Sequence, residues 1–397
     1  MSKVHPRVLM LGWELPPFNS GGLGEACLGL ARALSKNGVN VIFVLPQKVD
    51  LEFDFMDLVF ANVTSTNEKI IQTYESYKSW FDKGLVFQEF PSDFISAAIK
   101  YAENIKDIAV KYAPDLIHAH DWLTFPAAMV AKEVVGTPLV IQFHSTEFDR
   151  TGGHFPNPVV YEIERSAVEK ADRIIAISKL QKDIIMSNYK VDISKVDLVY
   201  DACNFFQINK LPPALSVYKD LGYKIVLFLG RITLQKGPEY FVRAAKKVLE
   251  FEDKVLFVVT GSGDMLERMI SEASWLGILN KFLFTGFLQG EEKFRIMQAA
   301  DLYVMPSVSE PFGMVPLEII ANGTPVLLSK QCGVGEVLNH VLKVDFWDID
   351  EMANKIIAVI RHKCLHDDLV KESGREILGI SWDNSAQRCL DIYQQLL

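Results

Sequence analysis

The chain has 397 residues, 49% of them hydrophobic, and a formal net charge of −9. This length predicts two domains rather than one, with ample apolar material for their cores. The negative charge argues against non-specific nucleic-acid binding and, more weakly, against tight contact with anionic lipid.

The N-terminal segment Met1–Arg7 is short and polar, and the apolar run Val8–Leu11 is too short for a signal-peptide core or a membrane span. We therefore expect a cytoplasmic protein without stable membrane insertion. The five cysteines lie far apart with no paired spacing, which favours buried reduced thiols over a disulfide framework or a zinc site.

Short β-rich apolar runs alternate with helical stretches in the first half, which predicts a parallel sheet. The expected strands are Arg7–Leu11, Val39–Leu45, Leu116–Ala119, Leu139–Phe143, Arg173–Ile177 and Val196–Val199. The expected helices are Gly22–Lys36, Asp93–Tyr112, Phe125–Val135, Pro158–Lys170 and Lys179–Asn188. The less regular segment Lys48–Glu89 is expected to hold a hairpin or a mobile segment.

The second half repeats the alternation. Its expected strands are Lys224–Leu229, Val255–Thr260, Phe282–Thr285, Leu302–Met305, Pro325–Ser329 and Leu342–Val344. Its expected helices are Pro238–Phe251, Met265–Leu276, Glu291–Ala300, Val315–Asn322 and Ile349–Arg361. We predict an α/β protein of two doubly wound domains, residues 1–207 and 218–380, with a hinge within Asn204–Gly222. Ligands should lie at the carboxyl ends of the strands, in a cleft across which the domains face each other.

The segment Ser309–Glu318 carries two carboxylates around a glycine-bearing turn that follows an expected strand. Ionised carboxylates only accept hydrogen bonds, so Glu310 and Glu318 suit hydroxyl-rich groups. They could equally form an acid/base pair, and Glu318 alone could be a solvated helix residue. The backbone N–H groups of Phe312, Gly313 and Met314 could meet a phosphate or a sugar hydroxyl.

Arg231 and Lys236 flank the turn after strand Lys224–Leu229. A diphosphate clamp is the functional interpretation and two solvated surface cations the alternative; their position at a strand's carboxyl end favours the clamp. Gly261 and the pair Gly286-Phe287 end two further strands, where a base would lie if phosphates sit at Arg231. Sugar hydroxyls beside a diphosphate indicate a nucleotide sugar.

Histidines lie at the ends of two expected strands in the first half of the chain. His118, His120, Asp121 and Trp122 form His-x-His-Asp-Trp. No further ligands lie nearby in sequence, so we expect no metal, and one histidine could simply belong to the core. Asp121 and Trp122 suit a sugar through hydrogen bonding and stacking. His144 ends the next strand and is expected in a site rather than in a core.

A glycine-rich turn, Gly21-Gly22-Leu23-Gly24, leads from the first strand into the first helix. It suits close approach to a phosphate at a helix N-terminus, although tight helix–sheet packing explains it equally well.

Together these motifs resemble the retaining GT-B glycosyltransferases of family 4 and their glycogen and starch synthase relatives, over nearly the whole chain. The glycine turn is similar to the family's glycine loop, and His120-Asp121-Trp122 to a segment typical of glycogen synthases. Arg231 and Lys236 resemble its phosphate-binding pair. Glu310 to Glu318 resembles its Glu-x7-Glu signature, the most specific element.

The resemblance implies a role for each residue. Glu310 would hold the donor sugar and Glu318 the ribose, while Arg231 and Lys236 would neutralise the leaving diphosphate. His144 would contact the sugar near the reacting carbon. Further donor contacts would come from Gly21, Gly22, Gly261, Gly286, Phe287, Phe312, Gly313 and Met314, and acceptor contacts from His120, Asp121 and Trp122.

The resemblance also implies front-face attack with retention, no metal and no cofactor, because the nucleotide sugar is a co-substrate. The last segment, 381–397, would form a helix that crosses back onto the first domain. One departure concerns the donor: bacterial glycogen synthases carry Lys two residues before the glycine pair, where this chain has Asn19. This weakens an ADP-glucose assignment.

The leading hypothesis is therefore transfer of a hexose, preferably glucose, from a nucleotide sugar to a carbohydrate such as an α-glucan. A lipid-linked or cell-envelope acceptor is the alternative, although helix Asp93–Tyr112 mixes its lysines with acidic residues. A nucleotide-sugar epimerase of the same fold is less favoured, and a non-catalytic two-lobed sugar-binding protein is disfavoured by the intact charged motifs. The sequence indicates neither base nor oligomeric state.

Overall fold

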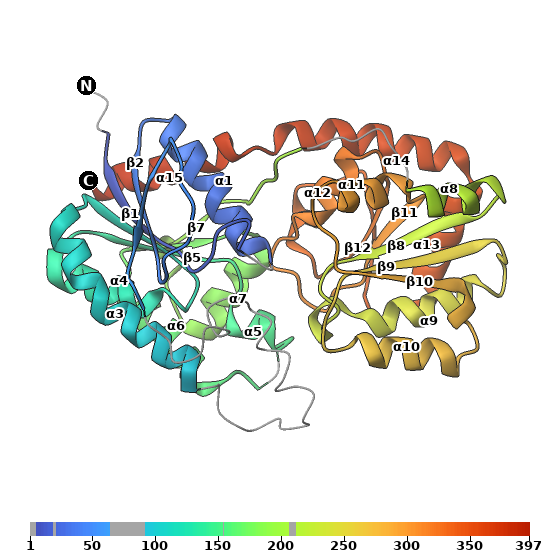
Figure 1. The fold of residues 1–397 in the computed structure, drawn as a ribbon, viewed down its shortest axis with the longest axis horizontal. Helices are drawn as coiled ribbons and strands as arrows, with labels where there is room; N and C mark the ends of the chain where they lie inside the picture. The colour runs from blue at the N-terminus through green and yellow to red at the C-terminus, as the bar shows by residue number, and fades with distance from the viewer. Residues whose placement is uncertain (1–4, 19–20, 64–91, 154, 206–211) are drawn as a thin grey trace. The chain divides into compact units, whose positions relative to one another are not determined.

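The structure is a computed structural model that describes residues 5–18, 21–63, 92–153, 155–205 and 212–397. The chain divides into two compact units (Figure 1). The first unit comprises Met1–Cys203 and Ser381–Leu397, and the second comprises Asn204–Ile380. The chain thus leaves the first unit once and returns to it for its last helix. Asn19 and six residues of the expected hinge lie outside the described residues.

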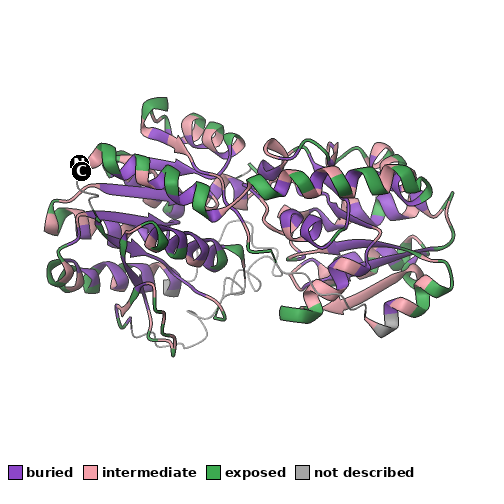
Figure 2. Ribbon diagram, turned by 90° about the horizontal axis from the view of Figure 1, so that it is seen from above, coloured by how far each residue is buried: buried purple, intermediate pink, exposed green. Residues whose placement is uncertain are grey.

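The first unit is built on a seven-stranded sheet whose pairings are all parallel, in the order β3-β2-β1-β4-β5-β6-β7. Its strands are β1(Arg7–Leu11), β2(Asn40–Leu45), β3(Asp57–Phe60), β4(Leu116–His120), β5(Leu139–Phe143), β6(Arg173–Ala176) and β7(Val196–Leu198). The central strands β4 and β5 are buried along their whole length (Figure 2). Strands that are buried on both faces are typical of parallel sheets covered by helices.

Helices cover this sheet and close its core. They are α1(Gly22–Lys36), α3(Ser92–Tyr112), α4(Phe125–Val135), α5(Glu147–Arg150), α6(Pro158–Lys170), α7(Lys179–Tyr189) and α15(Trp382–Leu396). α3 packs against α4, and α15 packs against α1. Gly29 in α1 allows this last contact, because a Cβ atom there would lie 2.4 Å from the Trp382 ring.

The second unit has a six-stranded sheet in the order β10-β9-β8-β11-β12-β13, again with every pairing parallel. Its strands are β8(Lys224–Leu229), β9(Val255–Thr260), β10(Phe282–Gly286), β11(Leu302–Met305), β12(Val326–Ser329) and β13(Leu342–Val344). Its helices are α8(Pro213–Asp220), α9(Pro238–Val248), α10(Leu266–Trp275), α11(Gly290–Ala299), α12(Val315–Ala321), α13(Ile349–Arg361) and α14(Lys363–Glu376).

The strand orders place a topological switch point in each sheet. In the first unit the order reverses between β1 and β4, and in the second between β8 and β11. Ligands of doubly wound proteins bind outside the carboxyl ends of the strands at such points. The predicted fold class, two doubly wound α/β domains with parallel sheets, is confirmed.

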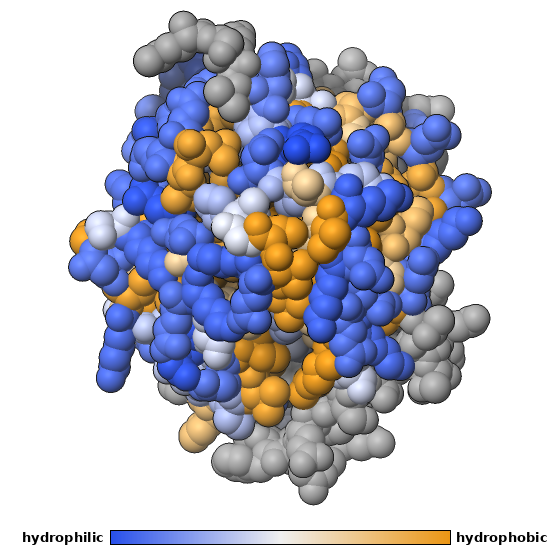
Figure 3. Space-filling model, turned by 90° about the vertical axis from the view of Figure 1, so that its left-hand side faces the viewer, coloured by the Kyte–Doolittle hydropathy of each residue, from blue (hydrophilic) through white to orange (hydrophobic). Residues whose placement is uncertain are grey.

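The face of the first unit that Figure 3 shows is mainly hydrophilic with some apolar patches. On α3, Ile99 and Val110 are exposed, but so are Glu103, Lys106 and Asp107. This mixture differs from the basic amphipathic face of helices that lie on membranes. Across the described residues, no helix combines the length and the apolar character that crossing a bilayer requires.

Candidate active site

The carboxyl ends of β8, β9 and β10 are joined through glycine backbones. The Gly230 N–H donates to the Thr260 carbonyl at 3.0 Å, and the Gly261 N–H donates to the Gly286 carbonyl at 2.9 Å. A Cβ atom on Gly261 would lie 1.9 Å from the Gly230 carbonyl oxygen. The close approach of the two turns therefore requires glycine at 261 and leaves a side-chain-free surface at the strand ends. Beyond Gly286, the Phe287 side chain is 55% exposed.

The turn after β8 and the loop after β11 meet at the switch point. The Val308 N–H donates to the Gln235 carbonyl at 2.8 Å, which fixes the two backbones together. Beside this link, Lys236 Nζ forms an ion pair with Glu310 Oε2, with both side chains largely withdrawn from solvent. Arg231, on the same turn, is exposed. Two predicted residues distant in sequence, Lys236 and Glu310, thus lie in direct contact.

The segment around Glu310 is anchored by backbone hydrogen bonds. The Glu310 N–H donates to the Gln331 carbonyl, and the Gly333 N–H donates to the Glu310 carbonyl. Phe312 is 1% exposed, so its ring belongs to the core and only its backbone could face a ligand. Gly313 adopts φ +97°, in the region that favours glycine, and Met314 precedes α12.

Glu318, in the first turn of α12, also has a cationic partner. Lys293 Nζ on α11 lies 2.7 Å from Glu318 Oε2, and both side chains are mostly buried. The carboxylate is therefore not simply a solvated helix residue. Lys293 was not predicted from the sequence, because a single lysine on an amphipathic helix is indistinguishable from a surface cation.

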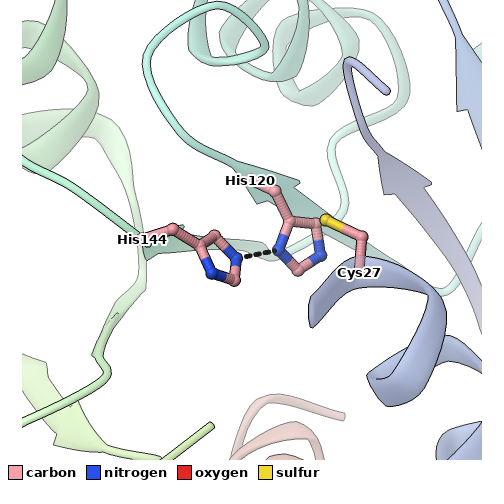
Figure 4. Close-up of side chains that lie close together, drawn as sticks. All are labelled: Cys27, His120 and His144. Carbon is pink, nitrogen blue, oxygen red and sulfur yellow. Dashed lines mark hydrogen bonds between the residues drawn. The ribbon is translucent and has the colours of Figure 1, made fainter. Parts of the chain in front are cut away.

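In the first unit, three histidine rings form a row at the ends of β4 and β5. The His118 and His120 ring centroids are 4.4 Å apart, and those of His120 and His144 are 5.3 Å apart. His120 Nδ1 and His144 Nε2 are hydrogen-bonded at 3.0 Å (Figure 4). His118 Nδ1 lies 2.7 Å from the Tyr393 hydroxyl of α15, so His118 is the histidine with a partner in the core.

His144 is set apart from its neighbours by its charge environment. Burial alone would lower its pKa, but the interactions with the Asp201 carboxylate and with Cys27 outweigh that effect and raise the pKa well above the ordinary value. Asp201 Oδ2 lies 3.6 Å from His144 Nδ1, and both side chains are nearly buried. Burial and the neighbouring rings instead lower the pKa of His120 well below its ordinary value. The arrangement favours a cationic His144 beside a neutral His120.

The structure places Asp121 and Trp122 differently from the sugar-binding roles predicted for them. Asp121 is 2% exposed, and its Oδ1 accepts hydrogen bonds from the backbone N–H groups of His144, at 2.7 Å, and Ser145, at 3.2 Å. Trp122 is 1% exposed, which leaves no ring face for stacking on a sugar. As a correction, Asp121 holds the backbone at His144 and Trp122 is a core residue.

The glycine turn precedes α1 at the switch point of the first unit. Gly21 has an extended backbone, and a Cβ atom there would meet nothing within 4 Å. The alternative explanation by tight packing therefore does not hold for Gly21, and Gly22 begins the helix. Within the first unit the structure brings His120 and His144 together, and within the second it joins Lys236 to Glu310.

Cys27 and Asp201 were missed by the sequence analysis. Cys27 was expected only as a buried reduced thiol, although it lies in the second turn of the helix that follows the glycine loop. Asp201 follows β7, so the rule that ligands collect at the carboxyl ends of strands could have found it.

Two family profiles match the chain, one in each half. The profile of glycosyl transferases group 1 matches residues 216–376. The profile of the starch synthase catalytic domain matches residues 7–190.

Curated relatives extend these matches across the chain. An uncharacterised glycosyltransferase of Methanocaldococcus jannaschii is 29% identical over 98% of both chains. A D-inositol 3-phosphate glycosyltransferase of Salinispora tropica is 30% identical over 78% of this chain and 70% of its own. A glycogen synthase of Mycobacterium tuberculosis is 25% identical over 84% of this chain and 80% of its own.

Solved structures share the fold at lower identity. Sucrose-phosphate synthase from Thermosynechococcus elongatus has a TM-score of 0.78 at 19% identity, covering 98% of this chain and 99% of its own. HepE of Anabaena, solved with UDP and glucose, has a TM-score of 0.72 at 18% identity, covering 99% of this chain and all of its own.

Proposed function

Because this chain belongs to the GT-B glycosyltransferases, we propose that it is a retaining hexosyltransferase that moves glucose from a nucleotide sugar to an α-glucan. The observation that carries the proposal is the contact of Lys236 with Glu310 at the switch point of the second sheet. It puts a cation suited to phosphate beside a carboxylate suited to sugar hydroxyls. A nucleotide sugar presents these two groups side by side.

In the proposed reaction, the second unit binds the donor. Lys236 and Arg231 neutralise the charge that develops on the departing diphosphate, which is the main contribution of the protein to the rate. In the free chain Lys236 is paired with Glu310. When the donor binds, this ion pair breaks: Lys236 then binds a phosphate of the donor, and Glu310 accepts a hydrogen bond from a sugar hydroxyl. Glu318 likewise accepts hydrogen bonds from the ribose, with Lys293 holding its carboxylate.

The reacting carbon is then attacked from the face that the diphosphate leaves. The phosphate takes the acceptor proton, so the reaction uses neither a protein nucleophile nor a metal. His144 contacts the donor sugar near this carbon. Its raised pKa keeps the ring cationic, and a cationic ring donates hydrogen bonds from both nitrogens. We place this activity in the cytoplasm, as expected for an enzyme of soluble carbohydrate metabolism.

The donor and the glucan acceptor are tested together. The protein is incubated with UDP-glucose, ADP-glucose and GDP-glucose, each with α-glucan primers of defined length, and products are analysed by mass spectrometry and anomeric NMR. We expect α-linked extension of a primer from at least one donor. Absence of transfer to every primer would remove the glucan assignment, and a β-linked product would remove retention.

A small phosphorylated acceptor is the second candidate, favoured by the relative named a D-inositol 3-phosphate glycosyltransferase at 30% identity. Adding inositol 3-phosphate to the same donor panel separates the two acceptors. An assay without any acceptor detects the epimerase alternative as conversion of the donor itself. In each assay the Arg231→Ala/Lys236→Ala variant is the control, and an unchanged rate in it would refute the diphosphate clamp.

A further inference from the structure

Cys27, His120 and His144 form a compact cluster in the first unit, called here the thiol–imidazole cluster (Figure 4). One ligand atom from each residue lies within 4.8 Å of the other two. Cys27 comes from α1, His120 is the last residue of β4, and His144 directly follows β5. Two consecutive strands and a helix from much earlier in the chain therefore position one sulfur and two imidazoles around one point.

The spacing of the two rings suits a metal ion. His120 Nδ1 and His144 Nε2 are 3.0 Å apart. Two imidazole nitrogens bound tetrahedrally to Zn²⁺ at about 2.0–2.1 Å lie roughly 3.3 Å from each other. An ion thus fits between them with a displacement of a few tenths of an ångström. Cys27 and His120 are fully buried and His144 is 8% exposed, so the donors are largely shielded from competing water.

Two carboxylates hold His144 in place beside the cluster. Metal-bound histidines commonly pass their other ring N–H to a carboxylate, which orients the ring and strengthens it as a ligand. Asp201 Oδ2 lies 3.6 Å from His144 Nδ1, on the side of the ring away from His120. Asp121 fixes the backbone at the same histidine, because its Oδ1 accepts from the N–H groups of His144 and Ser145. The carboxylate of Asp201 would also balance the charge left when one thiolate binds a divalent cation.

We propose that the thiol–imidazole cluster binds one Zn²⁺ ion through Cys27, His120 and His144, with Asp201 as the outer partner of His144. Zinc suits this mixture of one thiolate and two imidazoles. Binding releases to solvent two protons: the thiol proton of Cys27 and the one proton that His120 Nδ1 and His144 Nε2 share in their hydrogen bond. Three protein ligands leave one coordination position open for water.

This site has a consequence for catalysis that rests on the proposed function. A His144 Nε2 bound to zinc carries no proton, so it cannot exchange its hydrogen bond with His120 for one to a sugar hydroxyl. Zinc would therefore inhibit transfer reversibly, without acting in the reaction. The sequence did not predict this site, because no further metal ligand lies close to His118 and His120 along the chain. Cys27 approaches His120 only through the fold, from the first helix.

Direct binding is measured on the full chain without any nucleotide sugar, using Co²⁺ as a spectroscopic probe and Zn²⁺ in equilibrium dialysis. We expect one ion per chain and a thiolate-to-cobalt charge-transfer band. Cys27→Ser and His120→Asn should abolish the band, with Cys27→Ala as a second variant should Cys27→Ser fold poorly. Asp201→Asn should weaken binding by about 10–100-fold.

The exposed thiol Cys364 provides the matched control. Cys364→Ser should leave binding and the cobalt spectrum unchanged. No stoichiometric binding to the unmodified chain would overturn the proposal, as would zinc binding of equal affinity in Cys27→Ala. Loss of binding in Cys364→Ser would do the same, since the ion would then occupy an exposed cysteine.

The inhibition is tested separately. The rate with added Zn²⁺ is compared with the rate in chelator, for the unmodified chain and for Cys27→Ala. A drop that chelator reverses, and that Cys27→Ala lacks, supports the coupling to His144. Stoichiometric binding with an unchanged rate would overturn the coupling. Absence of any transferase activity would count against the proposed function alone, because the binding measurement does not depend on it.

Discussion

The charge of His144 is the balance of two opposing effects on one ring. Burial favours the neutral form, whereas the interactions with the Asp201 carboxylate and with Cys27 favour the imidazolium and prevail. Because the folded pKa is raised above the unfolded value of about 6.5, the stabilisation is fully present below that pH. It is lost as the pH rises through the higher, folded pKa.

Asp201→Asn should reverse this balance. Without the carboxylate, burial dominates and the pKa of His144 falls, so the ring loses its proton at a lower pH. Titration of the histidine ring signals by NMR checks this directly, and the alkaline limb of the activity profile should move in the same direction. The control is Asp197→Asn, since Asp197 lies on β7 nearby but pairs with Arg173. An unaltered His144 titration in Asp201→Asn would contradict the assignment.

The ion pair of Lys236 with Glu310 predicts an unusual pattern of stabilities. Both side chains are mostly buried, so Lys236→Met leaves a carboxylate without its counter-charge and should cost about 3 kcal/mol of unfolding free energy. Lys236→Met/Glu310→Gln removes both charges and should recover much of that loss. Urea unfolding measures each variant. As control, Lys330→Met breaks the more exposed pair with Asp345 and should cost under about 1 kcal/mol. A double variant less stable than the single would refute this account.

At the scale of elements, β4 and α15 are joined by the buried contact of His118 with the Tyr393 hydroxyl. Burial, with repulsion from His144, lowers the pKa of His118 to about 3. The unfolded chain binds this proton near pH 6.5 and the folded chain only near pH 3, so stability falls as the pH drops between those values. The slope from one such group reaches about 1.4 kcal/mol per pH unit.

His118→Gln should therefore flatten the acid limb of the stability curve, even if it lowers stability at neutral pH. Chemical unfolding from pH 7 to pH 4 measures the slope. His362→Gln, at an exposed position before α14, serves as the control and should leave the slope unchanged. An equally steep acid limb in His118→Gln would mean that other groups cause the acid sensitivity.

The turn after β9 is the element that most constrains the site in the second unit. Gly261 has φ +139°, and a Cβ atom would overlap the Gly230 carbonyl, so Gly261→Ala should cost about 3 kcal/mol. Gly374→Ala is the matched control, because Gly374 lies inside α14 with open space around it. Alanine at this position should increase the free energy of unfolding by about 0.5–1 kcal/mol. Thermal unfolding compares the two, and equal stabilities would show that the turn has room to relax.

At the scale of the molecule, the sequence predicted the apolar strands well and the polar or marginal elements poorly. β8 and β9 are almost continuous apolar runs bounded by clear breaks, and they form as predicted. α14 was not predicted, since only Leu369 and Ser373 of its side chains are buried and no side chain caps its start. β3, at the edge of the sheet with no fully buried residue, was also missed.

The same distinction applies to the candidate site. Residues at the carboxyl ends of central strands, such as Lys236, Glu310 and His144, could be found because topology determines where those ends lie. Lys293 could not, since its role depends on the packing of α11 beside α12, which no local pattern encodes. The role predicted for Trp122 was wrong because it was based only on the position of this residue at a strand end, which suggested contact with a ligand. In the structure Trp122 belongs to the hydrophobic core of the first unit, and no local sequence pattern shows this burial.

The discontinuity of the first unit leads to a prediction about folding. The last helix, α15, belongs to this unit: Ser385 Oγ donates to the Tyr200 carbonyl at 2.6 Å, Lys36 pairs with Asp383, and Trp382 packs on Gly29. A fragment of residues 1–203 lacks all these contacts and leaves His118 without its hydroxyl partner. It should therefore be poorly folded or prone to aggregate.

Joining residues 1–203 to 381–397 through a short Gly/Ser linker should restore cooperative unfolding, since the hydrogen bond between Ser385 and Tyr200 holds the two ends close together. Circular dichroism and sedimentation compare the fragment, the fusion and a fusion carrying Trp382→Ala. The last variant should be intermediate, because truncating a buried aromatic side chain costs about 3–5 kcal/mol while the rest of the helix remains. If the fragment of residues 1–203 alone unfolded as cooperatively as the fusion, α15 would not be part of the core of this unit. The buried ring of His118 would then not require the Tyr393 hydroxyl as its partner.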